Sequence, residues 1–557
     1  MLGALCAALL TLSACSRDRR GGIQSAGDVF RAWNPTTLKE VRGVHIATVR
    51  AEMQHQLAAK HELATPHQWQ HVKRLYTAYQ MSPLWLDGDG LIKDRADALV
   101  DALVNATTDA IQLDPKALHA LAQNLDTLRH TKQPSAAQLV HADLMLTIMY
   151  TALGEDYLTG QVNPTTVGQS WHIDPQDEEV DSALTRSIRD KNLANAIGRM
   201  RPTEYDYEML RRKLGDLRQI VAHGGWPQVP AGKALKRGEA DSPARIQALR
   251  TRLSSEGFQA EASSSGDSTK AKAVFDASLA AAVAQFQAHH AIGVDSMLGK
   301  ETLDALNVPA TFRLAQVAAN LERYRWLPRS LGARYILVNV PAFRLQGFEN
   351  GVKRIEMKVI VGADFEGRAT PVFSDSMEYV IFRPYWDVPD KIMENEILPK
   401  GVPADFEMTT QNGKPHLRQR PGPKNALGYV KFLFPNDFNI YLHDTPNHSL
   451  FNQDVRAFSH GCIRLEKPDQ LAEWVLGWDA TRVHDAMENG PDDRRVNLPH
   501  KIPVYIAYFT AYMRDGQLWF GNDLYRRDDQ LAQAVAGGAL PSPEAVQAVE
   551  ALRKQTN

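Results

Sequence analysis

The chain has 557 residues, and its 63 Lys and Arg nearly balance its 65 Asp and Glu. This balance excludes the strongly basic surface typical of nucleic-acid-binding proteins, so we expect no nucleic-acid partner. The apolar content of 44% is that of a globular protein. A chain of this length is expected to form about three or four domains.

The first fifteen residues are predicted to be a leader rather than part of a domain. Met1 to Ala14 is an apolar run that is too short to span a bilayer and suits a secretion signal. It ends in Leu12-Ser13-Ala14-Cys15, which resembles a lipobox, where the cysteine is acylated after cleavage. We therefore expect a periplasmic protein anchored to a membrane through a lipid on Cys15, with residues 16–40 as a polar tether. An ordinary signal peptide or an uncleaved anchor is the alternative.

Residues 41–235 are predicted to form an α-helical scaffold domain. Apolar residues recur there at helix spacing, as at Leu99 and Leu103 and again at Val140 and Leu144. The region contains no catalytic constellation. We interpret Trp85 as a core anchor rather than as part of a ligand site.

Residues 241–310 are predicted to form a compact unit of three short helices. Asp241-Ser242-Pro243 supplies a helix start, and Ala262–Ser268 is expected to be a flexible loop. The unit contains Phe286-Gln287, Gly293-Val294-Asp295 and Gly299. With these residues it resembles a peptidoglycan-binding domain, although Ser296 stands where that family usually has glycine. A docking module that binds no glycan is the alternative.

Residues 311–530 show the pattern of a mixed-β domain, with β-branched runs that predict strands. Asp515-Gly516 predicts a hairpin turn, and Pro468 and Gly477 bracket an amphipathic helix. Residues 387–430, punctuated by proline and glycine, are predicted to be a cap inserted between strands. Residues 531–557 are predicted to be a C-terminal tail.

Outside the leader the chain has one cysteine, in Ser459-His460-Gly461-Cys462-Ile463-Arg464-Leu465, and His443 lies nineteen residues upstream of it. An unpaired cysteine with a histidine is the pattern of a thiolate nucleophile and its base. The glycine permits a tight turn that can aim backbone N–H groups at an oxyanion, and the neighbouring cations can favour the thiolate. A buried structural thiol is the alternative.

The same residues carry a family resemblance. Tyr441–Pro446 and Arg456–Leu465 closely resemble the signature of L,D-transpeptidase catalytic domains of the YkuD type. The likeness to long, multi-module L,D-transpeptidases of Gram-negative bacteria extends through Asn320–Trp326, Glu396–Lys400, Pro421–Gly428 and Lys431–Asn436. We therefore expect a multidomain α+β protein with a mixed-β catalytic domain, a three-helix peptidoglycan-binding-like domain and an α-helical scaffold.

The resemblance implies a peptidoglycan L,D-transpeptidase that forms 3→3 cross-links through a thioester acyl-enzyme on Cys462. The donor would be a tetrapeptide stem cleaved after the L-centre of its diaminopimelate, and the acceptor would be the side-chain amine of another stem. A lipoprotein lysine and a free D-amino acid are the alternative acceptors. The expected partners are peptidoglycan stem peptides and glycan. No cofactor is implied, and carbapenems are expected to acylate Cys462.

The resemblance favours His443 as the base, oriented by a backbone carbonyl near Asp444, with His460 as an auxiliary residue. Backbone N–H groups of Gly461 and Cys462 are predicted to form the oxyanion hole. Arg464 is predicted to bind a substrate carboxylate, with a structural salt bridge as an equal alternative. The predicted substrate-binding set is completed by Tyr441, Trp386 and Ser459, and core packing is the alternative for the two aromatic residues.

Three other functions remain as alternatives. A zinc site would need His443, His448, His460 and Cys462, but His443 and His448 are five residues apart and no HExxH or CxxC motif occurs, so no metal is expected there. A cell-wall cysteine endopeptidase or amidase would pass the acyl group to water instead of an amine. A non-catalytic peptidoglycan-binding anchor protein is the third alternative. Such a protein would have no enzymatic activity, so Cys462→Ala would change nothing.

Overall fold

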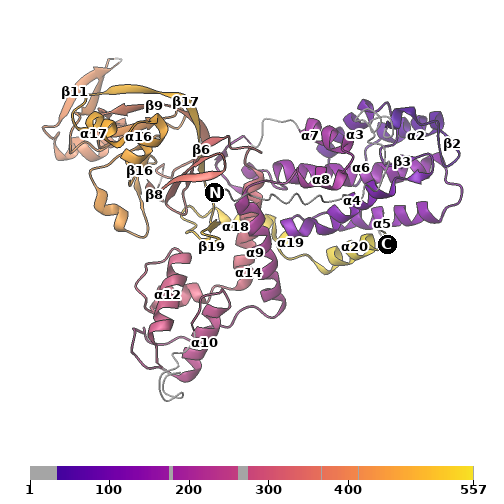
Figure 1. Ribbon diagram of the computed structural model, residues 1–557, viewed down its shortest axis with the longest axis horizontal. Coiled ribbons are helices and arrows are strands. Elements are labelled where there is room, and N and C mark those ends of the chain that lie inside the picture. Colours follow the sequence, from indigo (N-terminus) through magenta and orange to yellow (C-terminus); the bar gives the residue numbers. More distant parts are fainter. Residues whose placement is uncertain (1–33, 175–179, 261–273, 366, 412, 556–557) are drawn as a thin grey trace, which may run out of the picture.

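The computed structural model describes residues 34–174, 180–260, 274–365, 367–411 and 413–555. The predicted leader, Cys15, most of the tether and the Ala262–Ser268 loop lie outside these residues. Figure 1 shows a helical body on the right, a sheet-rich body on the left and a small helical unit below. Helices α9 (Tyr205–Ala222) and α14 (Ala310–Arg325) stand between them.

The helical body has a hydrophobic core of its own, and α6 contacts most of its other helices. α6 is long and apolar enough to cross a membrane, but 72% of its apolar window is buried inside the molecule, so we interpret it as a core helix. Capping boxes at Thr65 and Ser135 begin α3 and α6. The helices are α2 (Ile46–Ala58), α3 (Pro66–Ala78), α4 (Lys93–Asn105), α5 (Pro115–His130), α6 (Ala136–Thr159), α7 (Val180–Arg189) and α8 (Leu193–Gly198). The short hairpins β1 (Glu40–Val41)–β2 (Val44–His45) and β3 (Leu86–Asp87)–β4 (Gly90–Leu91) accompany them.

Trp85 is fully buried in this core, in agreement with its interpretation as an anchor. Its Nε1 donates to Thr147 Oγ1 at 2.8 Å, and its backbone N–H donates to the carboxylate of Asp143 at 2.8 Å. Burial raises the pKa of Asp143 to about 6, although the hydroxyl of Tyr76 also donates to this carboxylate. A polar cluster inside the core thus fixes how the first helices pack.

The small unit consists of α10 (Pro243–Ser254), α12 (Ala277–His289) and α13 (Lys300–Leu306) around its own core. Gln287, which is buried, accepts from the backbone N–H groups of Asp295 and Ser296 and donates to Thr302 Oγ1. Ser296 has a φ of +60°, the left-handed region that favours glycine. The departure from the glycine of the resembling family therefore introduces backbone strain but leaves the loop intact.

The sheet-rich body contains a ten-stranded mixed sheet that closes on itself, because β13 pairs with both β14 and β9. The strand order is β13-β14-β16-β8-β7-β6-β17-β9-β5, and β15 also pairs with β8. Helices α16 (Pro468–Leu476) and α17 (Ala480–Glu488) pack on it, and their apolar residues join its core. The strands are β5 (Trp171–His172), β6 (Arg334–Asn339), β7 (Arg344–Glu349), β8 (Val352–Gly362), β9 (Val372–Phe382), β13 (Val430–Leu433), β14 (Leu442–His443), β15 (Ala457–Ser459), β16 (Ile463–Leu465) and β17 (Arg494–Ala507).

Helix α14 joins the bodies through side chains that are almost all buried. Glu322 and Arg325 form a fully buried ion pair at 2.5 Å, and Glu322 Oε1 also accepts from the Val162 backbone N–H at 2.8 Å. Arg325 donates to the Asp109 carbonyl at 2.8 Å, and Arg323 pairs with Asp528 at 2.6 Å. The Asn320–Trp326 motif is therefore the junction between the helical body and the sheet.

Two predicted segments differ from the structure. The scaffold was expected to extend to residue 235, but β5 within it pairs in parallel with β9, and α9 shares the core of the sheet. The expected C-terminal tail consists of α18 (Asp528–Ala534), α19 (Ala536–Ala539) and α20 (Pro543–Arg553). Ala548 and Leu552 of α20 lie in the core of the helical body, because α20 presents an apolar stripe to α4 and α5.

Candidate active site

Strand pairing brings the predicted nucleophile and base to one face of the sheet. β14 runs parallel to β16, with Leu442 opposite Ile463 and His443 opposite Arg464. Side chains alternate along strands, so His443 and Tyr441 share a face with Arg464 and Cys462. All four line one pocket of about 830 Å³.

His443 is buried and oriented by the next residue in the chain. Its Nδ1 lies 2.6 Å from the carbonyl oxygen of Asp444. A carbonyl can only accept, so Nδ1 carries the proton and Nε2 keeps its lone pair. Burial, aided by the positive charge of Arg464, lowers the pKa of His443 to about 3. The imidazole is therefore neutral and able to accept a proton at neutral pH.

The carboxylate of Asp444 accepts hydrogen bonds from the backbone around it. It accepts from the N–H groups of Tyr429 at 2.9 Å and Thr445 at 2.7 Å. Gly428 lies against this carboxylate with a φ of +61°, and a Cβ at that position would overlap the Asp444 side chain. The end of the Pro421–Gly428 stretch thus requires glycine for the close approach that holds Asp444, and through it His443.

Cys462 is half-buried, and its sulfur lies 3.7 Å from the carbonyl oxygen of Asn439. Burial raises the pKa of the Cys462 thiol to about 11, although Arg464 and the backbone N–H and hydroxyl of Tyr441 act in the opposite direction. The sequence led us to expect that neighbouring cations favour the thiolate. Burial outweighs them, so the resting group is a thiol.

The turn before Cys462 contains hydrogen bonds of two groups that we had assigned other roles: the Ser459 hydroxyl to substrate binding and the Gly461 N–H to the oxyanion hole. Ser459, only 2% exposed, accepts from the Gly461 N–H at 3.1 Å and donates to the Cys462 carbonyl at 2.5 Å. The Ser459 hydroxyl and the Gly461 N–H thus both have partners within the turn, because these hydrogen bonds close it. Ser459 also lines the pocket, and the roles predicted for the two residues stay predictions.

Two residues that the sequence analysis did not identify, Thr370 and Tyr525, support this turn through hydrogen bonds from other segments. Thr370 Oγ1 donates to the Gly461 carbonyl at 2.8 Å. The Tyr525 hydroxyl donates to the Gly362 carbonyl at 2.7 Å and accepts from the Thr370 N–H at 3.1 Å. Gly461 has a φ of +119°, so the turn needs glycine at that position. No local pattern around Thr370 or Tyr525 could have indicated this support.

Arg464 reaches the pocket without a carboxylate partner in the described part of the chain. There it forms no ion pair, and its Nε is buried without a hydrogen-bond partner. The alternative of a structural salt bridge is therefore not supported. A guanidinium in this position can bind a carboxylate that enters the pocket.

The predicted cap, residues 387–430, has a small sheet and core of its own. Its strands pair in the order β10-β12-β11, and Val388, Met393 and Leu417 are buried together. Trp386 lines the pocket and also packs against this core. Its position is therefore compatible with both substrate binding and core packing. The cap elements are β10 (Trp386–Asp387), α15 (Asp390–Ile392), the π-helical turn η4 (Met393–Ile397), the 3-10 turn η5 (Leu398–Lys400), β11 (Phe406–Gln411) and β12 (Lys414–Gln419).

Glu396 of η4 fastens the cap to the catalytic turn. Its Oε1 lies 2.8 Å from His460 Nε2 and 2.8 Å from a guanidinium nitrogen of Arg368. Hydrogen bonding to His460, with the charge of Arg368, lowers the pKa of Glu396. His460 is therefore turned toward the cap, and its auxiliary role stays a prediction.

The four side chains of the zinc alternative do not converge within the described residues. His443 Nδ1 faces a backbone carbonyl and His460 Nε2 faces Glu396. His448 is exposed on a 3-10 turn, η6 (His448–Asn452), with its Nε2 3.6 Å from Asp444.

Comparison with known proteins agrees with the fold class. Residues 333–505 match the family described as "L,D-transpeptidase catalytic domain" (YkuD), residues 242–306 match "Putative peptidoglycan binding domain", and residues 70–214 match "Scaffold domain". The chain therefore carries a YkuD-type L,D-transpeptidase catalytic domain together with a peptidoglycan-binding domain and a scaffold domain. These matches confirm the predicted family resemblance and the multidomain α+β fold class.

A curated protein of Haemophilus influenzae (strain ATCC 51907 / DSM 11121 / KW20 / Rd), named "Putative L,D-transpeptidase", is 32% identical over 244 residues. The alignment covers 39% of this chain and 48% of that protein, so the chain spans about half the length of this relative. A solved L,D-transpeptidase (residues 123–326) from Xylanimonas cellulosilytica DSM 15894 is 15% identical, covering 50% of this chain and 99% of that chain, with a TM-score of 0.15.

Proposed function

We propose that the protein is a peptidoglycan L,D-transpeptidase that forms 3→3 cross-links through a thioester on Cys462. The observation that carries the proposal is the common face of His443 and Cys462 in the pocket, with the tautomer of His443 fixed by the Asp444 carbonyl. The match of residues 333–505 to the L,D-transpeptidase catalytic domain supports the same reaction class.

In the first step, Cys462 Sγ attacks the carbonyl carbon after the diaminopimelate L-centre of a tetrapeptide stem. The thiol proton passes to His443 Nε2, which is the free acceptor of the neutral imidazole. The carbon–nitrogen bond breaks, and His443 returns the proton to the departing amine. The product is an acyl-enzyme in which the acyl group is bound to sulfur.

In the second step, the side-chain amine of another stem attacks the thioester. His443 takes a proton from the amine, a new amide bond forms, and the proton returns to Cys462 Sγ. The Cys462 N–H would donate to the oxyanion in both steps, since the Gly461 N–H is bonded to Ser459. Arg464, which has no ion pair among the described residues, would bind a stem carboxylate.

The test uses sacculi and a carbapenem with purified enzyme. We expect 3→3 muropeptides by mass spectrometry and one carbapenem adduct by intact mass, both lost in Cys462→Ala. His443→Ala should slow acylation by about 100-fold or more, the usual scale for a general base. An adduct that persists in Cys462→Ala, or a His460→Ala variant slower than His443→Ala, would reject these assignments. Release of free stems without cross-links would instead identify a cysteine endopeptidase or amidase.

We further propose that the protein works in the periplasm, anchored by a lipid on Cys15, and that the three-helix unit binds glycan. The leader sequence supports the first point, and the match of residues 242–306 supports the second. Metabolic labelling with a fatty acid should mark the parent and not Cys15→Ser. Co-sedimentation with sacculi should fall when residues 242–306 are replaced by a linker.

A further inference from the structure

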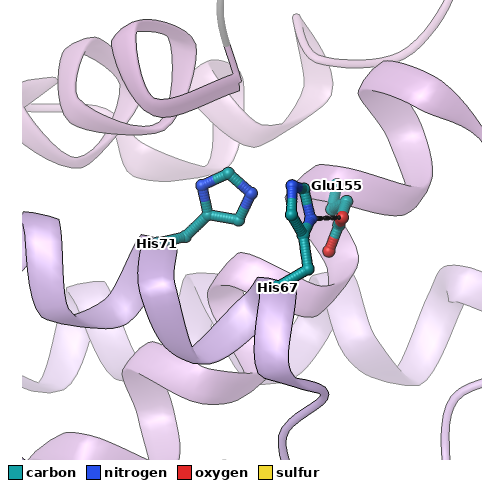
Figure 2. A group of neighbouring side chains, drawn as sticks. All are labelled: His67, His71 and Glu155. Atoms are coloured by element: carbon teal, nitrogen blue, oxygen red, sulfur yellow. Dashed lines mark hydrogen bonds and ion pairs between the residues drawn. The ribbon is translucent and has the colours of Figure 1, made fainter.

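Far from the catalytic pocket, the helical body gathers two histidines and a carboxylate (Figure 2). His67 and His71 lie one turn apart on α3, and Glu155 of α6 faces them. Residues four apart share one side of a helix, so both imidazoles point the same way. One ligand atom from each residue lies within 4.8 Å of the others, and His67 Nδ1 is 2.5 Å from Glu155 Oε1.

His71 has one ring nitrogen occupied and the other free. The residue is 3% exposed, and its Nδ1 is hydrogen-bonded to the carboxylate of Asp181, which also pairs with Arg74. Nδ1 also lies 3.1 Å from a guanidinium nitrogen of Arg74, but its contact with the Asp181 carboxylate is the shorter one. Because a carboxylate can only accept, we assign the proton to Nδ1 and a lone pair to Nε2. Within the described residues this buried Nε2 has no hydrogen-bond partner. Figure 2 shows the free side of the ring turned toward His67 and Glu155.

We propose that His67, His71 and Glu155 bind a divalent transition-metal ion, with zinc as the best fit. Two imidazoles and one carboxylate form a known zinc ligand set that leaves a fourth position for water. A carboxylate that accepts from the far nitrogen of a metal-bound histidine is the usual outer support, and Asp181 supplies it for His71. Magnesium and calcium prefer sites made of oxygen ligands.

The spacing of the three ligand atoms suits such an ion. Tetrahedral ligands at zinc bond lengths lie about 3.4 Å from one another, so atoms within 4.8 Å need only small rotations to reach one ion. The exposed His67 is free to make this adjustment, while the buried His71 is held by Asp181.

The site is expected to bind the ion without hydrolytic chemistry. In zinc peptidases a glutamate follows the first histidine of the helix and serves as the general base. Here Gln68 follows His67, and its side chain is used in the capping box with Thr65. The ion would instead clamp α3 to α6 and, through Asp181, to α7.

The binding experiment uses residues 16–557 with Cys462→Ala, so that no cysteine is present, after removal of metal by a chelator. Titration calorimetry with zinc chloride should show one equivalent bound. His67→Asn and Glu155→Gln should each weaken binding by at least tenfold. The matched control His130→Asn changes another exposed helical histidine and should bind like the parent. Equal zinc affinity in all four proteins, or no uptake by the parent, would overturn the proposal.

Two further readouts separate metal binding from misfolding. X-ray absorption of the zinc-loaded protein should show two imidazole ligands, and one or none in His67→Asn. Zinc should raise the melting temperature of the parent and of His130→Asn by several degrees, with little effect on His67→Asn. His67 is exposed, so His67→Asn should melt like the parent when both are metal-free. A zinc-induced rise of the same size in His67→Asn would contradict the assignment.

Discussion

Cys462 and His443 are both uncharged at pH 7, because burial raises the pKa of the thiol to about 11 and lowers that of the imidazole to about 3. The pair therefore differs from an ion pair in which the thiolate is already formed. Nucleophilic attack requires the proton to leave Cys462 as the new bond forms. A protonated thiol also reacts slowly with electrophiles other than the substrate. This protonation protects Cys462, the only cysteine outside the predicted leader, from modification.

The pH dependence of alkylation tests this protonation state. Below pH 11 the thiolate fraction of Cys462 rises about tenfold per pH unit, so its reaction with iodoacetamide should keep accelerating from pH 7 to pH 10. His443 is already neutral above about pH 4, so its titration should leave no step between pH 5 and pH 8. Mass spectrometry of the modified protein gives the rates. A plateau reached by pH 8 would show that the thiolate is stabilised at neutral pH.

The close contact at Gly428 is a second feature of residue scale. Gly428→Ala should destabilise the protein by about 1–3 kcal/mol, the usual cost of overpacking, and should slow acylation because Asp444 orients His443. Gly477→Ala is the matched control, since Gly477 has a similar φ of +65° but open space around it. Denaturant unfolding and carbapenem acylation measure both effects. Equal losses of stability and acylation rate in the two variants would mean that the effect of Gly428→Ala comes from φ strain and not from the Asp444 contact.

Among the groups of secondary-structure elements, the cap contacts the catalytic turn through Glu396. Glu396→Ala removes both the His460 and the Arg368 contacts. Pairs this exposed contribute about 0.2–1 kcal/mol each, so the open cap should become severalfold more populated. Water would then compete better with the amine, and the ratio of hydrolysed to cross-linked muropeptides should rise.

The neighbouring Glu394→Ala is the control for this prediction, because Glu394 is exposed on the same turn. Product ratios from sacculi, measured by chromatography and mass spectrometry, should be unchanged in it. If Glu396→Ala also keeps the parent ratio, the cap is a structural insertion instead of a lid.

Structural features could be predicted from the sequence where the contacts that determine them lie close together in the chain. The Tyr441–Leu465 stretch carries its own turn and strands, which is why the family and the mixed-β fold could be recognised. Asp515-Gly516 forms the expected hairpin between β18 (Ala511–Arg514) and β19 (Gln517–Phe520), and both turn residues have positive φ. Such signals depend on neighbours in the chain.

The missed features depend on contacts between distant segments. Thr370 and Tyr525 reach the catalytic turn from far along the chain, and β5 is a strand of two residues. Ser459 was included in the predicted substrate-binding set. Its actual partners follow from the backbone path of the turn, which the motif alone does not specify.

For the whole molecule, the buried Glu322–Arg325 pair holds the helical body against the sheet. Glu322→Ala should lower the free energy of unfolding by about 3–5 kcal/mol, because it leaves the Arg325 charge buried without its partner. Glu349→Ala is the control, since Glu349 pairs with Arg334 and Arg354 in exposed contacts and should cost at most about 1 kcal/mol. Thermal and denaturant unfolding measure both, and similar losses would refute the role of the junction.

Helix α20 has a consequence for how the protein is made. Its apolar stripe completes the core that α4 and α5 begin, and Tyr525 of the same late region supports the catalytic turn. During synthesis, the early helices must keep an apolar surface open until α20 has emerged from the ribosome. A product that ends before Tyr525 would expose that surface and would lack the support of the turn before Cys462. Such a product would be a ready substrate for proteolysis.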